Sequence, residues 1–223
     1  MLKLGTRLNA VLQEINYVDT IADIGTDHGK LVVGAILCNR AKRAYAVDIS
    51  EKCLSKARKL AFDKGIEEKI TFLVGDGLTP LSRKVNTVVA AGIGGLEIIN
   101  ILQSEIREIA DKYIFVPHQD GYFLRKYLRD NNFYIEKDYV VFDGKFYDII
   151  VAVRGENNYL DAELFLGKDY PKSQFLYLRN KKREERIEDI MTQYAKSSSD
   201  KGLSDLLIKE LEVLKNVEDK PSN

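Results

Sequence analysis

Short apolar runs alternate with amphipathic stretches along most of the chain. The apolar runs, each followed by turn residues, predict five buried strands at 20–24, 43–48, 69–74, 86–91 and 113–117. The segments with helical spacing predict helices at 30–39, 51–64, 96–110 and 122–131. Strands that alternate with helix-length segments are typical of βαβ units, so the pattern predicts an α/β fold with a parallel sheet.

Two further strands are expected at 134–142 and 146–153, on either side of Asp143-Gly144. An Asp-Gly pair between two apolar runs is a strong hairpin signal, so the sheet is predicted to end in an antiparallel pair. Five βα units followed by a hairpin is the topology of class I (Rossmann-like) methyltransferases, by analogy with known folds.

The composition changes after Arg154, which suggests a Rossmann-like domain over residues 1–155 and a helical, coiled-coil-like extension over 156–223. A long charged helix is expected over 171–194 and a second one over 203–217, with the Ser-rich turn at 197–202 between them. The apolar stripe expected on the first helix consists of Phe175, Leu178, Ile187, Ile190, Met191 and Tyr194. The two helices are predicted to form an antiparallel hairpin.

Composition narrows the classes of function. The 223 residues have a net charge of zero, which counts against a large nucleic-acid footprint but is compatible with a local basic face. No apolar run is long enough to span a membrane and the start of the chain lacks a signal-peptide pattern, so we expect a cytoplasmic protein. Two cysteines and two histidines lie apart, and no metal site is expected. The chain is expected to be a monomer or weak dimer.

The strongest local signal is the run Asp23-Ile24-Gly25-Thr26-Asp27-His28-Gly29, between the first strand and the first helix of the alternating pattern. A glycine turn here lets backbone approach a ligand beside a helix N-terminus. The spacing is not the GxGxxG of dinucleotide enzymes, and a carboxylate would repel a pyrophosphate. A ligand that carries an ammonium and a sulfonium suits this acidic turn better. The alternative is a purely structural turn in which Asp27 caps the helix.

Three more signals follow successive strands. Asp48 can accept hydrogen bonds from both hydroxyls of a ribose, or it can lie in a loop beside a Ser50 cap. Gly75-Asp76-Gly77 can place a carboxylate beside an adenine amino group, or can be a plain turn. The glycine-rich run 91–95 suggests backbone that approaches a ligand or substrate, or a structural turn. All these signals fall at the carboxyl ends of strands, the edge where open α/β sheets bind ligands.

The motifs together resemble the TrmK family, bacterial enzymes that methylate N1 of the adenine at tRNA position 22. The resemblance covers essentially the whole chain and rests on Arg7-Leu8, DIGTDHG at 23–29, AVDIS at 46–50, GDG at 75–77, AGIGG at 91–95 and YDII at 147–150. The family usually has Met where Ile93 stands, and a Gln-Pro pair with a following polar residue where Val116-Pro117-His118 stands.

The resemblance implies S-adenosylmethionine as the cofactor and tRNA as the partner. The implied cofactor-binding residues are Asp23, Gly25, Asp48, Ile49, Asp76, Gly77 and Gly92. The implied substrate-binding residues are Gly94, Gly95 and Pro117. N1 of adenine already has a lone pair, and its methylation leaves a cationic ring. Asp27 is our candidate for stabilising that charge, supported by His28 and Arg7.

The N-terminal helix and the C-terminal helices are expected to grip the tRNA. Candidate phosphate contacts are Arg179, Lys181, Lys182, Arg183 and Arg186, unless this run is simply a solvated helix face. Tyr122, Phe123 or Tyr127 could stack on a base, although core packing is the commoner fate of aromatic side chains. Two other classes of function stay open: a small-molecule methyltransferase with a helical dimerisation arm, and a noncatalytic RNA- or partner-binding module.

Overall fold

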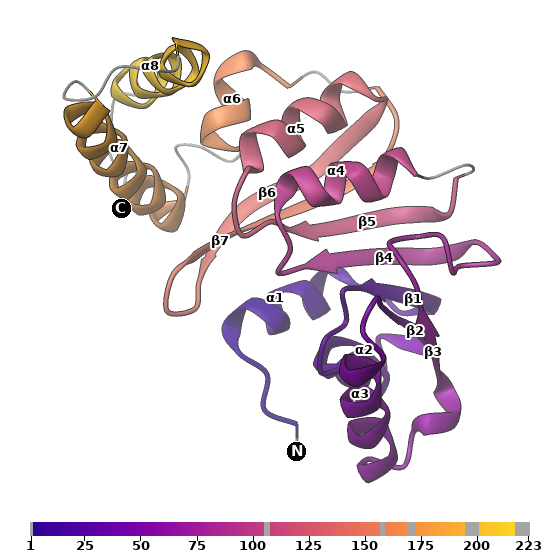
Figure 1. Cartoon of the computed structure of the whole chain (residues 1–223). Helices are drawn as coiled ribbons and strands as arrows, with labels where there is room; N and C mark the ends of the chain where they lie inside the picture. Colours follow the sequence, from indigo (N-terminus) through magenta and orange to yellow (C-terminus); the bar gives the residue numbers. More distant parts are fainter. Residues whose placement is uncertain (1, 105–107, 157–158, 169–172, 195–200, 217–223) are drawn as a thin grey trace.

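The computed structural model describes residues 2–104, 108–156, 159–168, 173–194 and 201–216. Its centre is a seven-stranded sheet in the order β3-β2-β1-β4-β5-β7-β6 (Figure 1). The strands are β1 Val18–Ile24, β2 Ala41–Asp48, β3 Ile70–Val74, β4 Val85–Ala91, β5 Ala110–Val116, β6 Phe133–Phe142 and β7 Phe146–Arg154. The strands β1 to β5 pair in parallel, whereas β7 is antiparallel to both β5 and β6. The predicted class I methyltransferase sheet with its terminal hairpin is confirmed.

Helices cover both faces of the sheet. They are α1 Thr6–Glu14, α2 Lys30–Leu37, α3 Glu51–Asp63, α4 Gly95–Gln103, α5 Gly121–Asp130, α6 Asp161–Leu166, α7 Gln174–Tyr194 and α8 Lys201–Lys215, with a 3₁₀ turn at Glu67–Lys69. One apolar cluster joins a face of the sheet to α4 and α5, and a second joins the opposite face to α1, α2 and α3. Each face of the sheet therefore buries its own core, and the carboxyl ends of the parallel strands are left free at one edge.

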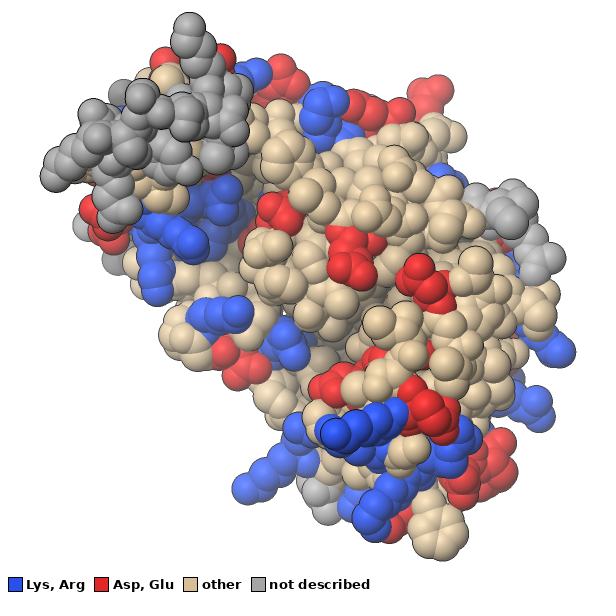
Figure 2. Space-filling model, in the orientation of Figure 1, with Lys and Arg blue, Asp and Glu red and all other residues tan. Residues whose placement is uncertain are grey.

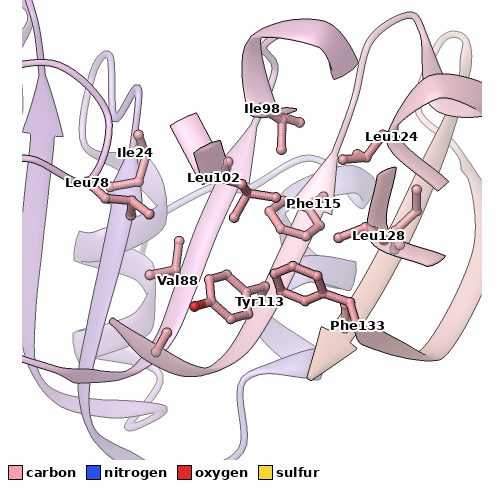
Figure 3. Packing of buried hydrophobic residues seen from close by; sticks show 14 of the residues in the cluster. Ile24, Leu78, Val88, Ile98, Leu102, Tyr113, Phe115, Leu124, Leu128 and Phe133 are labelled. Atoms are coloured by element: carbon pink, nitrogen blue, oxygen red, sulfur yellow. The ribbon is translucent and has the colours of Figure 1, made fainter. Parts of the chain in front are cut away.

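The first core is rich in aromatic rings (Figure 3). Tyr113 and Phe115 of β5 point to the same face, as the two-residue period of a strand requires, and both are fully buried. Tyr113 meets Phe133 of β6 edge to face, with ring centroids 5.4 Å apart. Ile98 and Leu124 close this core from α4 and α5. The packing fixes the two helices that begin beside the free edge of the sheet.

The predicted elements agree with the structure except at a few ends. The helix expected over 96–110 ends at Gln103, and Ala110 already pairs with Val85 as the first residue of β5. The ladder with β4 is the physical reason, because it satisfies the backbone of Ala110 and neighbouring residues in the sheet. The N-terminal helix, α1, packs against the β6–β7 hairpin at the other end of the sheet order.

The C-terminal helices α7 and α8 pack against each other. Arg183 of α7 pairs with Glu210 of α8, and Glu188 pairs with Lys215. These ion pairs link the two helices of the predicted hairpin. Leu214 and Ile187 are buried between the helices. The Ser-rich turn expected at 197–202 lies mostly outside the described residues.

The amino-terminal half of α7 buries a different side from the one predicted. Phe175 and Leu178 are 48% and 42% exposed, whereas Leu176 is fully buried. Arg179 faces the rest of the protein: its guanidinium donates to the carbonyls of Phe165 and Leu166 at 3.2 and 2.9 Å, at the end of α6. With these two hydrogen bonds, the buried side of α7 is shifted by one sequence position, from Phe175 and Leu178 to Leu176 and Arg179.

A buried cluster of charges joins the sheet to this extension. Arg125 of α5 donates to both carboxylate oxygens of Asp138, at 2.7 and 2.8 Å, and to Asp148 at 2.9 Å. The Arg179 Nε lies 3.4 Å from the other Asp148 oxygen, and the Tyr159 hydroxyl donates to Asp138. Burial opposes the charge on Asp148, but Arg179 and Arg125 outweigh burial and lower its pKa. This cluster, which we name the joint, links α5, the β6–β7 hairpin and α7.

Candidate active site

A cavity of about 550 Å³ opens at the carboxyl edge of the parallel strands. Its volume lies within the range that holds a small molecule or cofactor. The loops after β1, β2, β3 and β4 form its wall, together with Arg7 and Leu8 of α1. Lining residues include Asp23, Gly25, Asp27, His28, Asp48, Ile49, Asp76, Gly77 and Gly92. The structure thus brings every predicted cofactor-binding and catalytic residue to one cavity.

Asp23 is the buried carboxylate of the site. It is the penultimate residue of β1, has only 4% of its surface exposed and accepts a 2.8 Å hydrogen bond from the Thr26 hydroxyl. Burial raises the pKa of Asp23 to about 7; the nearby carboxylates of Asp48 and Asp27 add to this rise, and the bond from Thr26 works against it. The site therefore holds a carboxylate whose negative charge lacks compensation, which suits a cationic ligand.

The turn after β1 places two polar side chains toward solvent. Asp27 adopts a left-handed conformation with φ of 48°, and its carboxylate lies 2.5 Å from Nδ1 of His28. The other ring nitrogen of His28 is 3.2 Å from Nζ of Lys56 on α3. Gly29, not Asp27, is the N-cap of α2, and no side chain caps that helix. The alternative role of Asp27 as a helix cap is therefore wrong.

Gly29 explains why this turn is compact. A β carbon at Gly29 would lie 2.6 Å from the β carbon of Ala57, so α2 begins in direct contact with α3. Gly29 also has a φ of 69°, which is costly for other residues. This second glycine of the motif serves helix packing, and only the first, Gly25, lines the cavity.

Asp48 combines a structural and a ligand-facing position. One carboxylate oxygen accepts from the backbone N–H of Ser50 at 2.9 Å, and the other accepts from that of Asp27 at 3.1 Å. The Ser50 hydroxyl caps α3 by accepting from Cys53. A carboxylate oxygen has two lone pairs, so Asp48 keeps acceptor capacity toward the cavity. Ile49 beside it is 74% exposed and offers an apolar surface to a flat ring.

The third and fourth strand ends complete the wall. Asp76 is exposed at the cavity, and Gly77 has a φ of 53° and lies close to Ile101 of α4. Gly92 follows β4 with a φ of 91° and an exposed backbone. Ile101 and Ile49 are both on the wall, so the pocket has apolar surface as well as carboxylates.

The predicted substrate residues lie just outside this cavity. Gly95 begins α4, and a β carbon there would lie 2.5 Å from the carbonyl oxygen of Asp120. Its N–H donates to Gln119, while the His118 N–H donates to Ile93. The loops after β4 and β5 are therefore stapled together, and we name residues 92–95 with 117–120 the ledge. Gly94 and Pro117 belong to the ledge, but neither is among the described residues that line the cavity.

Some of the basic side chains near the site already bind other groups of the protein. Figure 2 shows Lys and Arg side chains gathered over α7 and, separately, over α2 and α3, with carboxylates between them. Arg179 lies in the joint with 12% of its side chain exposed, and Arg183 pairs with Glu210, so both are poor candidates for the predicted phosphate contacts. Lys182 and Arg186 are exposed.

The aromatic candidates for base stacking divide in a similar way. Tyr122 stacks on Phe165 with centroids 4.3 Å apart, and Tyr127 packs against the core. Phe123 is 38% exposed at the start of α5. Of the three, only Phe123 has a side chain with substantial exposed surface.

Among the described residues, neither a cluster of metal-ligand side chains nor a membrane-spanning helix is found. No group of three or more His, Cys, Asp or Glu side chains there could hold a metal ion. None of the described helices is both long and apolar enough to cross a membrane.

The chemistry of the wall fits S-adenosylmethionine, which joins an adenosine to a methionine through a sulfonium. Asp48 suits the ribose hydroxyls, and Ile49 suits a face of the adenine. The buried carboxylate of Asp23 provides negative charge that suits an ammonium and a sulfonium. A pyrophosphate would meet these same carboxylates, so the structure also disfavours a dinucleotide.

Comparisons with known proteins agree with this geometry. Residues 4–150 match the family model described as "Methyltransferase domain". The tRNA (adenine(22)-N(1))-methyltransferase of Bacillus subtilis is 29% identical over 161 residues, 70% of this chain and 68% of that protein. The crystal structure of B. subtilis TrmK has a TM-score of 0.83 at 24% identity, covering 96% of this chain and 98% of that one.

The solved structure of M. capricolum TrmK contains the cofactor product S-adenosyl-homocysteine. It has a TM-score of 0.83 at 24% identity and covers 95% of this chain and 96% of that one. The likeness thus extends past the methyltransferase domain into the C-terminal helices. The chain belongs to the methyltransferase-domain family and, within it, to the TrmK group that its motifs predict.

Proposed function

We propose that the protein transfers a methyl group from S-adenosylmethionine to N1 of an adenine in tRNA, at position 22. The observation that carries this proposal is the cavity at the strand edge, where Asp23, Asp27 and Asp48 meet beside the glycine ledge. The name of the B. subtilis relative supports the tRNA substrate and its position.

The proposed cofactor contacts follow from the wall. Asp48 would accept hydrogen bonds from the ribose, with Ile49 and Ile101 against the purine and Asp76 near its amino group. Asp23 would face the cationic part of the ligand. The backbone of Gly25, Gly77 and Gly92 would let the ligand approach the protein closely.

The role proposed for Asp27 is electrostatic. S-adenosylmethionine supplies an electrophilic methyl group on its sulfonium. Adenine N1 already carries a lone pair, so no residue of the chain has to remove a proton before the attack. The methylated ring is cationic, and a carboxylate beside it stabilises the developing charge. His28, at 2.5 Å, orients the Asp27 carboxylate, and Lys56 contacts the far side of the imidazole.

The proposed tRNA contacts lie on both sides of the cavity. Lys182 and Arg186 on α7 are exposed cations that suit the phosphate backbone. Phe123 and the ledge lie at the same edge of the sheet, where a flipped adenine would arrive. A cytoplasmic location accords with such a substrate, and a monomer or weak dimer stays a prediction.

The test uses radiolabelled S-adenosylmethionine and unmodified tRNA, with the labelled nucleoside identified afterwards. Label in 1-methyladenosine at position 22 is expected. Absence of label in tRNA, with S-adenosylmethionine still bound in calorimetry, would redirect the substrate to a small molecule or another RNA. Absence of binding as well would favour a noncatalytic module.

The same assay tests Asp27. Asp27→Asn keeps the size of the side chain and tolerates the left-handed backbone, but removes the charge. We expect kcat to fall about a hundredfold, the usual cost of removing one electrostatic stabiliser, with little change in cofactor affinity. Asp19→Ala removes an exposed carboxylate at the opposite edge of the sheet and is the matched control. Unchanged kcat in Asp27→Asn would exclude the role.

A further inference from the structure

The first turn of α1 has no cap of its own. Its N-cap residue is Gly5, and no side chain of α1 accepts from the free N–H groups there. The missing acceptor comes instead from the turn of the β6–β7 hairpin, where Asp143 Oδ2 accepts from the N–H of Arg7 at 3.2 Å. This is the hydrogen bond that an N-cap side chain normally makes to the second helical residue. Asp143 therefore caps α1 across 136 residues of sequence.

The contact is tight enough to be specific. A β carbon on Gly5 would lie 2.5 Å from the capping oxygen of Asp143, so only glycine leaves room for the carboxylate. Figure 1 shows α1 beside the turn of this hairpin. The other end of α1 is tied to the same hairpin, since Glu14 accepts from Lys137 Nζ at 2.8 Å and from the Tyr139 hydroxyl at 2.9 Å.

The capped turn carries a cation into the cavity. The Arg7 guanidinium lies 4.8 Å from the ring centroid of Tyr147, two residues beyond the hairpin turn. Its Nη1 would be 3.7 Å from a β carbon placed on Gly92. Arg7 and Lys30 are the two Lys or Arg side chains on the described cavity wall, which otherwise has five carboxylates. An arginine fixed in this way suits bidentate binding of a carboxylate or phosphate.

We propose that Asp143 is a positioning residue: it caps α1 from the hairpin turn and so holds Arg7 at the cavity, where Arg7 binds an anionic group of the ligand. The inference rests on the proposed function, under which two such groups reach the cavity. One is the carboxylate of the methionine part of the cofactor, and the other is a phosphate beside the target adenine.

The test compares Asp143→Ala, Asp143→Asn and Gly5→Ala in the full chain. Asp143→Ala removes the cap, and Gly5→Ala displaces the carboxylate from the opposite side while suiting the extended backbone at Gly5. We expect each to weaken binding of the anionic ligand about fivefold, as loss of one helix cap implies, with kcat unchanged. Asp143→Asn keeps an acceptor and should restore most of the affinity.

Two arms identify the anion. In calorimetry, a loss seen with S-adenosylmethionine but absent with 5′-methylthioadenosine, which lacks the carboxylate, assigns Arg7 to the cofactor. An unchanged cofactor Kd with a raised KM for tRNA assigns Arg7 to the RNA. The slope of log K for tRNA against log salt concentration should then fall by about one, as for the loss of one phosphate contact. The calorimetric arm reads out cofactor binding even if the tRNA assay shows no activity, so the two proposals fail separately.

Coupling to Arg7 separates positioning from general destabilisation. In an Arg7→Ala background, Asp143→Ala should cause no further loss, and Gly5→Ala should add nothing to Asp143→Ala. Tyr139→Phe, which removes a bond at the far end of α1, is the matched control and should leave both constants unchanged. Unchanged Kd and KM in Asp143→Ala, or an equal loss when Arg7 is already absent, would overturn the proposal.

Discussion

Replacing Asp23 by Asn should make the protein more stable above neutral pH and change its stability little in acid. Asp23 is buried and its pKa is raised from 3.8 to about 7, with burial as the largest cause. An acid with a raised pKa in the folded state loses its proton first in the unfolded chain. Wild-type stability should therefore fall as the pH rises from about 4 to about 7, and stay level above that.

The size of the effect follows from the shift in pKa. A shift of one pKa unit corresponds to about 1.4 kcal/mol, so the rise to about 7 corresponds to about 4 kcal/mol of unfolding free energy at pH 8. Asn has nearly the same size as protonated Asp and can keep a hydrogen bond to the Thr26 hydroxyl. The free-energy difference between Asp23→Asn and the wild type should therefore be small at pH 4 and approach this value at pH 8.

Urea denaturation of both proteins, repeated from pH 4 to pH 8, measures that difference directly. Parallel curves of unfolding free energy against pH would refute the reasoning, because they would mean that Asp23 titrates alike in both states. Binding of S-adenosylmethionine provides a second readout. A cationic ligand favours the ionised carboxylate, so wild-type affinity should rise with pH up to about 7, and Asp23→Asn should lose both affinity and this pH dependence.

Two further changes test packing. Arg179→Met removes the buried link between α7 and Asp148, and urea denaturation should show a loss of about 3 kcal/mol, as for other broken buried ion pairs; a loss below about 1 kcal/mol would mean that the joint does not hold α7. Gly29→Ala combines a φ of 69° with a 2.6 Å clash against Ala57, and should cost about 2–4 kcal/mol in the same assay. Gly65→Ala is the control, since Gly65 has a φ of 68° but no neighbour within 4 Å. Equal losses in the two glycine variants would exclude the steric contribution.

Much of the sheet could be predicted because its signals are local. The period of apolar residues and the Asp143-Gly144 turn predict every strand, and parallel strands necessarily bring their carboxyl ends to one edge. Asp23, Asp48 and Asp76 could therefore be expected in one cavity without knowledge of any distance. The acidic turn already favours a cationic ligand, but the target base follows only from the family resemblance, because no pattern of residues specifies it.

The missed features depend on contacts between distant segments. Asp138 and Asp148 occupy inward positions of strands, a local signal that each needs a buried partner, yet nothing in the sequence names Arg125 or Arg179 as that partner. Gly95 was expected at the substrate, but its lack of a side chain serves the close approach to Asp120. Helical spacing likewise predicts Phe175 and Leu178 on the buried side of α7, but both are exposed. Leu176 and Arg179 face the protein instead.

The stapled ledge has a consequence for how a substrate enters. Two backbone hydrogen bonds, Gly95 N–H to Gln119 and His118 N–H to Ile93, hold both loops against each other at 3.0 and 3.1 Å. A surface that backbone hydrogen bonds hold in this way is rigid, and it does not need to close around its substrate. Under the proposed function, the free-energy cost of unstacking the target base is then set by the RNA. Selectivity among tRNAs would follow how readily each one lets its adenine leave the stack, so weakening the stacking around the target would speed the reaction without any change in the enzyme.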